Sequence, residues 1–376
     1  MNAYDRRRFL RRAALAVAAG GMAAAGGALG YRAFAAAGRD TGDAVAMLLA
    51  ERVPRGAAVT VLAADADGPV YSAGFGESDR AAGTPAGTAT VYDIGSVTKQ
   101  FTAAAIMRLV ASGEIDTGEP VRRLLPGLPE DKGAITVHQL LTHTSGLVDS
   151  LGDDYAPLTR DGLIAEVAAS APLAPPGERY AYSNVGYGLL AAIVETATSM
   201  SYEEYLSAEL FTPAGMRHTG YLLPEWDRRS VAVEYAPDGS PLGRPDERGW
   251  DTDGPYWNLR GNGGLLSTAE DMLRWHHALD GGELLPPEAV RPLFTPHVAE
   301  DDSGTSHYGY GWVVADVDGV TVAWHNGGNG SSYAEVLRVP GGPFVFWATN
   351  TAVRSGEWNM EEADLANGIG ELLLKG

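Results

Sequence analysis

The sequence has no cysteine, so disulfide bonds, thiolate metal sites and a cysteine nucleophile are excluded. It is also poor in basic side chains: 28 Lys and Arg stand against 48 Asp and Glu, which gives a formal net charge of −20. Phosphate backbones repel such an acidic surface, so we expect no nucleic acid as a partner. Anionic lipids repel it as well, so we expect contact with a membrane only through an uncleaved export signal.

Several catalytic patterns are missing too. The sequence contains no His-Glu-x-x-His zinc motif, no Walker loop, no EF-hand loop and no Gly-x-Gly-x-x-Gly segment that opens a helix. Ser96 is not part of a Gly-x-Ser-x-Gly segment, which argues against the nucleophile elbow of α/β-hydrolases. We therefore expect a mechanism that uses neither a metal nor a cofactor.

The composition is that of a globular protein. Apolar residues make up 45% and charged residues 20% of the 376 residues, which provides ample material for a core. The length allows two or three domains by the usual size of a domain, and it also fits one large α/β domain.

The first 35 residues are typical of a twin-arginine export signal. Arg6, Arg7 and Arg8 precede a bulky apolar pair, an Ala/Gly-rich run extends over 13–29, and 33–35 offers an A-x-A cleavage site. Six Arg and one Asp lie in this segment, which leaves 22 basic and 47 acidic side chains, or −25, for the remainder. We expect an exported protein that is extracellular, periplasmic or associated with the cell wall. The alternative is a single uncleaved membrane anchor.

Residues 40–374 show strand patterns at both ends and helix patterns between them. Strands are predicted at 57–64, 70–75, 308–314, 320–324, 333–339 and 343–349. Helices are predicted at 40–52, from Ser96 onward, at about 267–279 and at about 358–374. This order predicts one domain of α/β (α+β) class. Its mainly antiparallel sheet comes from about 57–76 and 308–350, is flanked by helices, and has a helical region inserted at about 96–305.

Ser96 and Lys99 form the first pair with a catalytic pattern. Ser96 precedes a long helix, and Lys99, three residues later, projects from the same helical face. A serine hydroxyl needs a base to remove its proton. A buried lysine near the positive end of a helix dipole is pushed toward its neutral form and can be that base. Alone, Ser-x-x-Lys is a common pattern that also occurs as an ordinary surface pair.

Two further motifs follow in order, Tyr182-Ser183-Asn184 and His325-Asn326-Gly327. Together with the segment 94–102 around Ser96, and with supporting segments at 140–147 and 263–268, they resemble the serine β-lactamase and penicillin-binding protein superfamily. The form of the motifs is similar to the branch of class C β-lactamases and DD-carboxypeptidases. The resemblance covers about residues 45–370.

The resemblance implies a β-lactamase/transpeptidase-like fold and a role for each motif residue. The catalytic residues would be the nucleophile Ser96, the base Lys99 and the proton shuttle Tyr182. The substrate-binding residues would be Asn184, His325 and Gly327. The oxyanion hole would be made by the backbone N–H groups of Ser96 and Gly328.

Some of these residues also have a structural interpretation. Ser183 or Asn184 could simply cap a helix, and His325 could end a strand without chemistry. His143, in the supporting segment at 140–147, is expected to pack or hydrogen-bond beneath the site.

The resemblance implies a serine hydrolase with a covalent acyl-Ser96 intermediate, either D-alanyl-D-alanine carboxypeptidase-like or β-lactamase-related. Its substrate would be a peptidoglycan stem peptide, a β-lactam or an ester. The strand predicted from Tyr308 offers aromatic side chains but no arginine for a terminal carboxylate, which leaves an esterase or amidase of the same fold open. A slow-turnover penicillin-binding sensor is the remaining alternative.

Overall fold

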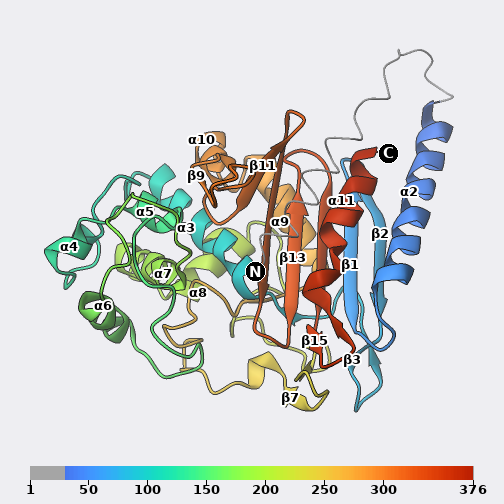
Figure 1. The fold of residues 1–376 in the computed structure, drawn as a ribbon, viewed down its shortest axis with the longest axis horizontal. Coiled ribbons are helices and arrows are strands. Elements are labelled where there is room, and N and C mark those ends of the chain that lie inside the picture. Colours follow the sequence, from blue (N-terminus) through green and yellow to red (C-terminus); the bar gives the residue numbers. More distant parts are fainter. Residues whose placement is uncertain (1–29, 376) are drawn as a thin grey trace.

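A computed structural model describes residues 30–375, with side chains from residue 40 onward, and its centre is an eight-stranded antiparallel sheet (Figure 1). In spatial order the strands are β2 (Gly68–Phe75), β1 (Val59–Asp65), β14 (Phe344–Thr349), β13 (Tyr333–Arg338), β12 (Val320–Gly328), β11 (Val313–Val317), β10 (His307–Tyr308) and β9 (Val298–Ala299). Outside this sheet, short pairs join β3 (Glu77–Asp79) to β4 (Thr84–Pro85), β5 (Tyr92–Asp93) to β8 (Leu266–Ser267), β6 (Glu234–Tyr235) to β7 (Pro241–Gly243) and β15 (Val353–Arg354) to β16 (Trp358–Asn359).

The two ends of the chain meet inside the main sheet. Val59 in β1 pairs with Thr349 in β14, and β13 and β12 continue the antiparallel ladder. Every residue of β14 is buried, which fits its almost unbroken apolar sequence, because a strand covered on both faces has no solvent side. The expected mixed α/β fold, with one antiparallel sheet built from both chain ends, is confirmed.

Helices cover both faces of this sheet. The helices α2 (Gly30–Arg52) and α11 (Leu365–Lys375) pack against one another and against the sheet, and α9 (Ala269–Gly281) lies behind it in Figure 1. β14 contacts both α11 and α9, so its apolar side chains are divided between two helical layers. The result is a continuous core that extends from the sheet into the helical region.

The inserted helical region lies beside the β9–β12 side of the sheet (Figure 1). Its α-helices are α3 (Lys99–Ala111), α4 (Glu130–Gly133), α5 (Val137–Leu141), α6 (Arg160–Ala169), α7 (Asn184–Thr198), α8 (Tyr202–Leu206) and α10 (Pro287–Val290). Single-turn elements are η1 (Gly95–Thr98), η2 (Val121–Arg123), η3 (Ser207–Phe211), η4 (Pro245–Glu247), η5 (Arg291–Phe294) and, near the C-terminus, η6 (Met360–Ala363).

Several element boundaries differ from the sequence-based predictions. The first described helix begins at Gly30 rather than at residue 40, so the predicted cleavage site at 33–35 falls within α2. The strand predicted at 308–314 is divided into β10 and β11 by a turn in which Gly309 N donates to Trp312 O. The last helix begins at Leu365 rather than near 358, because β16 and η6 occupy the preceding residues.

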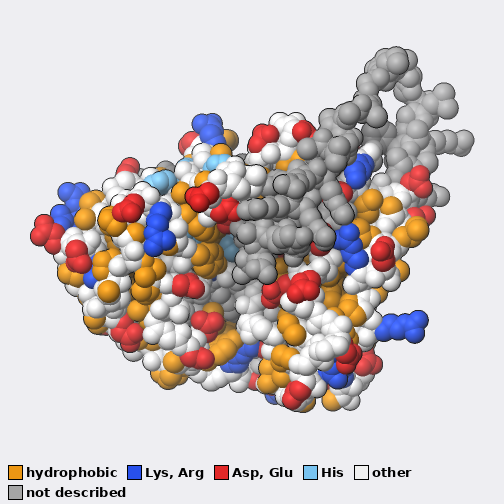
Figure 2. Space-filling model, viewed as in Figure 1, with side chains coloured by type: hydrophobic (Ala, Val, Ile, Leu, Met, Phe, Trp, Pro, Cys, Tyr) orange, Lys and Arg blue, Asp and Glu red, His pale blue; other side chains and the backbone are white. Residues whose placement is uncertain are grey.

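The rest of the predicted export signal, residues 1–29, lies outside the described residues. Within the part of the chain that the structure describes, no helix combines the length and the apolar character needed to cross a membrane. Acidic side chains are spread over the face of the molecule shown in Figure 2 rather than gathered at one place.

A buried ion pair ties α9 to the sheet. Arg338 at the end of β13 has a fully buried side chain, and its Nη2 lies 2.5 Å from Oδ1 of Asp280 on α9. Its guanidinium also stacks over the ring of Phe294, 4.7 Å from the ring centroid. An arginine enclosed in this way depends on its partner carboxylate, because an unpaired charge inside a protein is strongly unfavourable.

We expect Asp280→Ala to lower the free energy of unfolding by about 3–5 kcal/mol, because it leaves the Arg338 charge buried without a partner. Urea denaturation measures the change. Asp67→Ala, at an exposed position in the β1–β2 turn, is the control and is expected to lose less than about 0.5 kcal/mol. Equal losses in the two variants would contradict a stabilising role for the pair.

Candidate active site

Ser96 and Lys99 lie in contact where the chain enters its first long internal helix. Ser96 is part of the single turn η1, and Lys99 is the first residue of α3. The side chain of Lys99 reaches back along the chain, and its Nζ lies 3.1 Å from Ser96 Oγ. The structure thus brings together the predicted nucleophile and base.

The amine of Lys99 has two further partners, both of which can only accept hydrogen bonds. Nζ lies 2.7 Å from Asn184 Oδ1 and 2.7 Å from the backbone carbonyl oxygen of Asn262. A neutral amine has two hydrogens and one lone pair. The two carbonyl oxygens take the hydrogens, which leaves the lone pair for the hydroxyl of Ser96. This arrangement is that of a general base beside its nucleophile.

Burial increases the fraction of Lys99 that is a neutral amine near physiological pH. Lys99 is completely buried, and removal from water lowers its pKa from 10.5 to about 7, while the carboxylates of Asp149 and Asp154 raise it. Desolvation dominates because an ammonium loses more hydration energy on burial than an amine does. At pH 7 a large fraction of Lys99 can therefore accept a proton.

Tyr182 lies against the same amine. The Nζ of Lys99 is 4.9 Å from the centroid of the Tyr182 ring. Beneath the tyrosine, the ring of His143 packs at 4.3 Å between centroids, and its Nδ1 accepts a hydrogen bond from the backbone N–H of Ser183 at 3.0 Å. Burial, followed by the charge of Lys99, holds the pKa of His143 well below its usual range, so its ring is neutral. His143 has the expected supporting position beneath the site.

The Tyr-Ser-Asn motif combines a structural residue with a site residue. Ser183 is the N-cap of α7, because its Oγ accepts a hydrogen bond from Gly186 N at 3.1 Å. Asn184 is the first residue of that helix, and its side chain points to Lys99 instead. Asp149 Oδ1 accepts from both the Nδ2 and the backbone N of Asn184, at 3.0 and 3.2 Å. These bonds orient the amide so that its oxygen faces the lysine.

The third motif lies at the end of β12. The ring of His325 is buried, with Nε2 at 3.0 Å from Tyr308 Oη and Nδ1 at 2.7 Å from the carbonyl oxygen of Asn326. A carbonyl oxygen can only accept, so Nδ1 carries a hydrogen. The ring is thus held by β10 and by its own strand. A direct role of His325 in binding substrate stays a prediction.

Two glycines allow β12 to approach the nucleophile closely. A Cβ atom on Gly327 would collide with the backbone nitrogen of Ser96, and one on Gly95 would collide with the backbone nitrogen of Gly328. Gly95 also has a φ of +50°, which side chains other than glycine seldom tolerate. The backbone nitrogens of Ser96 and Gly328 are therefore brought to one place, as an oxyanion hole requires.

Two contributors to this site escaped the sequence analysis. The carbonyl of Asn262 binds Lys99 through the backbone, and its only signal is its position directly before the supporting segment at 263–268. Asp149, which holds Asn184, follows the supporting segment at 140–147 by two residues. A carboxylate in a loop gives no indication of the amide it will bind.

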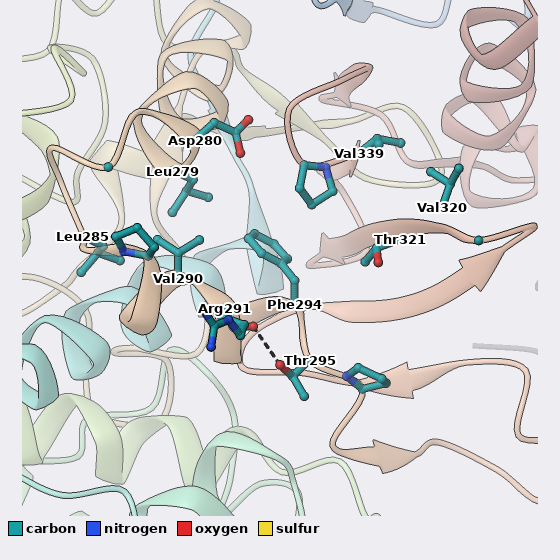
Figure 3. Close-up of a pocket in the computed structure, with 15 residues that line it drawn as sticks. Leu279, Asp280, Leu285, Val290, Arg291, Phe294, Thr295, Val320, Thr321 and Val339 are labelled. Carbon is teal, nitrogen blue, oxygen red and sulfur yellow. Dashed lines mark hydrogen bonds between the residues drawn. The ribbon is translucent and has the colours of Figure 1, made fainter.

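A cavity of about 650 Å³ lies apart from these residues, between the end of α9, the segment 285–296 and the turns that follow β11 and β13 (Figure 3). Leu279, Val290 and Phe294 line one wall of it. The cavity includes Val320, which is the first residue of β12, whereas Gly327 and Gly328 are at the other end of that strand. The cavity therefore shares no residue with the Ser96 site.

Comparisons with known proteins show the family of this chain. A family model described as Beta-lactamase matches residues 43–357. Penicillin-binding protein 4* of Bacillus subtilis is 31% identical over 269 residues, which cover 68% of this chain and 59% of that protein. Penicillin-binding protein 4 of Amycolatopsis lactamdurans is 31% identical over 312 residues, which cover 76% of this chain and 78% of that protein. The chain thus spans about three fifths of the length of the Bacillus relative.

A solved structure has the same fold. The octameric penicillin-binding protein homologue from Pyrococcus abyssi superimposes with a TM-score of 0.73 at 28% sequence identity, over 89% of this chain and 77% of that one.

We expect Lys99 to titrate near pH 7 in the folded protein. The sequence has only three lysines, Lys99, Lys132 and Lys375, so ¹³C-labelled lysine gives three resolvable NMR signals. Asp149→Asn is expected to lower the pKa of Lys99 further, because it removes a negative charge that stabilises the ammonium. Asp316→Asn, at an exposed position on β11, is the matched control and should leave the titration unchanged. A Lys99 signal that titrates near 10, like a solvent-exposed lysine, would refute the buried-amine assignment.

Proposed function

Because the chain belongs to the beta-lactamase family, we propose that it is a serine hydrolase that works through a covalent acyl-Ser96 intermediate. The observation that carries the proposal is the position of Lys99, whose buried Nζ lies 3.1 Å from Ser96 Oγ and is held by two carbonyl oxygens. Such a lysine has little structural purpose, since its burial costs hydration energy that its neutral hydrogen bonds repay only in part.

The reaction begins when Lys99 takes the hydroxyl proton of Ser96 as the Oγ attacks the substrate carbonyl. The new Oγ–C bond forms and the negative charge moves to the carbonyl oxygen, which the N–H groups of Ser96 and Gly328 stabilise. Tyr182, beside Lys99, passes the proton to the leaving amine or alcohol as its bond to the carbonyl carbon breaks. Water then attacks the ester carbon and gives a proton to the same base. The base returns that proton to Ser96 Oγ as the Oγ–C bond breaks, which releases the acid and restores the free hydroxyl of Ser96.

The charges around the base favour an ester or amide whose leaving group has no carboxylate. The ionised groups that act on Lys99 are the carboxylates Asp149 and Asp154. The guanidinium of Arg248, which contacts Asp93 close to Ser96 in the chain, is already paired with Asp93 and Glu234. A substrate carboxylate would therefore meet like charge rather than a free cation. This supports the esterase or amidase alternative.

A D-alanyl-D-alanine carboxypeptidase-like or β-lactamase-related activity is the second candidate. Its support is the 31% identity to two proteins that are named as penicillin-binding proteins. That name also fits a sensor that acylates and turns over slowly. The candidates share the acylation step and differ in the leaving group that they accept and in the rate of deacylation.

Export by the twin-arginine route is proposed from the N-terminal sequence alone. It would place the enzyme outside the cytoplasm, together with peptidoglycan stem peptides and penicillins. Processing at 33–35 would remove the first turns of α2.

We expect intact-protein mass spectrometry to detect an acyl adduct on the wild type with a penicillin or a short-chain nitrophenyl ester, and none on Ser96→Ala. Lys99→Ala should fold yet acylate at least about 100-fold more slowly, because a general base contributes a factor of about 10²–10⁴. Lys375→Ala, at an exposed position, is the matched control. Equal labelling of wild type and Ser96→Ala would remove the nucleophile assignment.

For the wild type, kcat/KM should increase as the pH rises through about 7, because Lys99 must lose its proton to act as the base.

Paired substrates separate the proposed activities. We expect a peptide ending in D-Ala-D-Ala amide, and a nitrophenyl ester, to be hydrolysed at least about tenfold faster than the same peptide with a free terminal carboxylate, because Asp149 and Asp154 oppose that charge. Steady-state kinetics at matched concentrations provide the comparison. Preference for the free carboxylate would establish the carboxypeptidase candidate instead, and a permanent penicillin adduct without turnover of any substrate would establish the sensor.

A further inference from the structure

A buried polar link connects the two segments that carry the proposed oxyanion hole. Asp93 lies shortly before Ser96, and its Oδ1 accepts a hydrogen bond from Gly95 N at 2.8 Å. Asn329 directly follows Gly328, and its Nδ2 donates to Asp93 Oδ2 at 3.0 Å. The hydrogen bond between Asn329 and Asp93 therefore joins the segment that leads to Ser96 with the segment that follows Gly328.

The amide of Asn329 uses its full hydrogen-bonding capacity. Its Oδ1 accepts from the backbone N–H groups of Ser331 and Ser332, at 2.9 and 2.8 Å, which shapes the turn that follows β12. Its Nδ2 donates its second hydrogen to Glu234 Oε1 at 2.8 Å. An amide with two acceptor and two donor contacts has one orientation, so it fixes the turn relative to both carboxylates.

One arginine forms ion pairs with both carboxylates. Arg248 contacts Asp93 through Nη1 at 3.2 Å and Glu234 through Nη2, and its guanidinium stacks 4.4 Å from the ring centroid of Tyr155. The side chains of Asp93 and Glu234 are 3% and 2% exposed, so little water screens the cluster. Two buried carboxylates, one guanidinium and one amide form a cluster in which Asn329 supplies hydrogens to both acids, and the hydroxyl of Ser332 also donates to Glu234 Oε1 at 2.7 Å.

We infer that Asn329 and Asp93 are positioning residues that hold the backbone N–H groups of Ser96 and Gly328 at the spacing the oxyanion requires. The inference rests on the proposed acyl-serine mechanism. The absence of side chains at Gly95 and Gly327 permits the close approach of the two segments but does not hold them together. The Asn329–Asp93 bond supplies an attraction that opposes their separation. Neither side chain is proposed to touch the substrate.

Asn329→Asp tests the link without removing the turn. The aspartate keeps an oxygen for the N–H groups of Ser331 and Ser332, but it replaces the donor by an acceptor that faces two carboxylates. We expect kcat/KM for a nitrophenyl ester, per titrated active site, to fall about 10- to 100-fold, since small displacements of preorganised donors have effects of this size. The dissociation constant of an arylboronic acid, whose adduct on serine mimics the tetrahedral intermediate, should rise by a similar factor.

The control is Asn359→Asp, at the half-buried N-cap of η6. Asn359 Oδ1 accepts from Glu361 N at 3.1 Å and its Nδ2 donates to Glu362 Oε1 at 3.3 Å, so the substitution makes the same chemical change outside the Asn329–Asp93 link. Both readouts should stay at wild-type values. The apparent pKa of kcat/KM should also stay the same in Asn329→Asp, because Lys99 is not part of the link.

The double substitution Asp93→Asn with Asn329→Asp exchanges donor and acceptor at unchanged net charge. It should recover part of the loss in kcat/KM, because the link to position 93 is restored while Glu234 still faces the new aspartate. If Asn329→Asp does not fold, Asn329→Ala, which breaks the link without adding a charge, is measured in the same way.

A folded variant with wild-type kcat/KM and boronate affinity overturns the inference, and so does a loss of thermal stability alone. A fall in kcat/KM with a shifted pKa and unchanged boronate affinity also overturns it. Absence of any Ser96 adduct in the wild type would instead refute the proposed function, so the two failures are distinguishable.

Discussion

The desolvation of a single amine determines how this site works. Lys99 is fully buried, so an ammonium there would be poorly solvated, whereas an amine is held by two carbonyl oxygens. Those carbonyls come from α7 and from the loop before β8, and the hydroxyl that the amine faces comes from η1. Each neighbouring element therefore has to be in place before the lysine has the correct basicity. The acidic surroundings moderate the effect, since Asp149 and Asp154 raise the pKa that burial lowers.

The site around Lys99 lies where an edge of the helical region packs against the sheet. The end of β12 meets η1 so closely that side chains are excluded at Gly95 and Gly327. His143 and the N-cap Ser183 fix the loop that carries Tyr182, and Asp149 fixes Asn184. Tyr182 and Asn184, which lie against the base, are thus held in place by neighbouring residues. Such supporting contacts preorganise the site, so little reorganisation is needed during the reaction.

Much of this architecture could be predicted from the sequence, because the relevant signals are local. The strands around β12–β14 show apolar β-rich patterns, and the Ser-x-x-Lys spacing places both side chains on one face of a helical turn. The backbone carbonyl of Asn262 could not be predicted, since a main-chain oxygen has no side-chain signature. The network of Asp93, Glu234, Arg248 and Asn329 was also missed, because its members are ordinary polar residues that only tertiary structure brings together. The late start of α11 was missed because apolar periodicity extends through η6.

The pairing of β1 with β14 also constrains how the molecule is made. Val59 leaves the ribosome long before Thr349, its partner in the ladder, so the centre of the sheet cannot close until β14 has been made. β12, which completes the surroundings of Ser96, likewise follows the whole helical region in the chain. A chain that is cut short before β12 would retain Ser96, Lys99 and Tyr182 but would lack the scaffold that aligns them. The proposed site can therefore form only after these strands have been made.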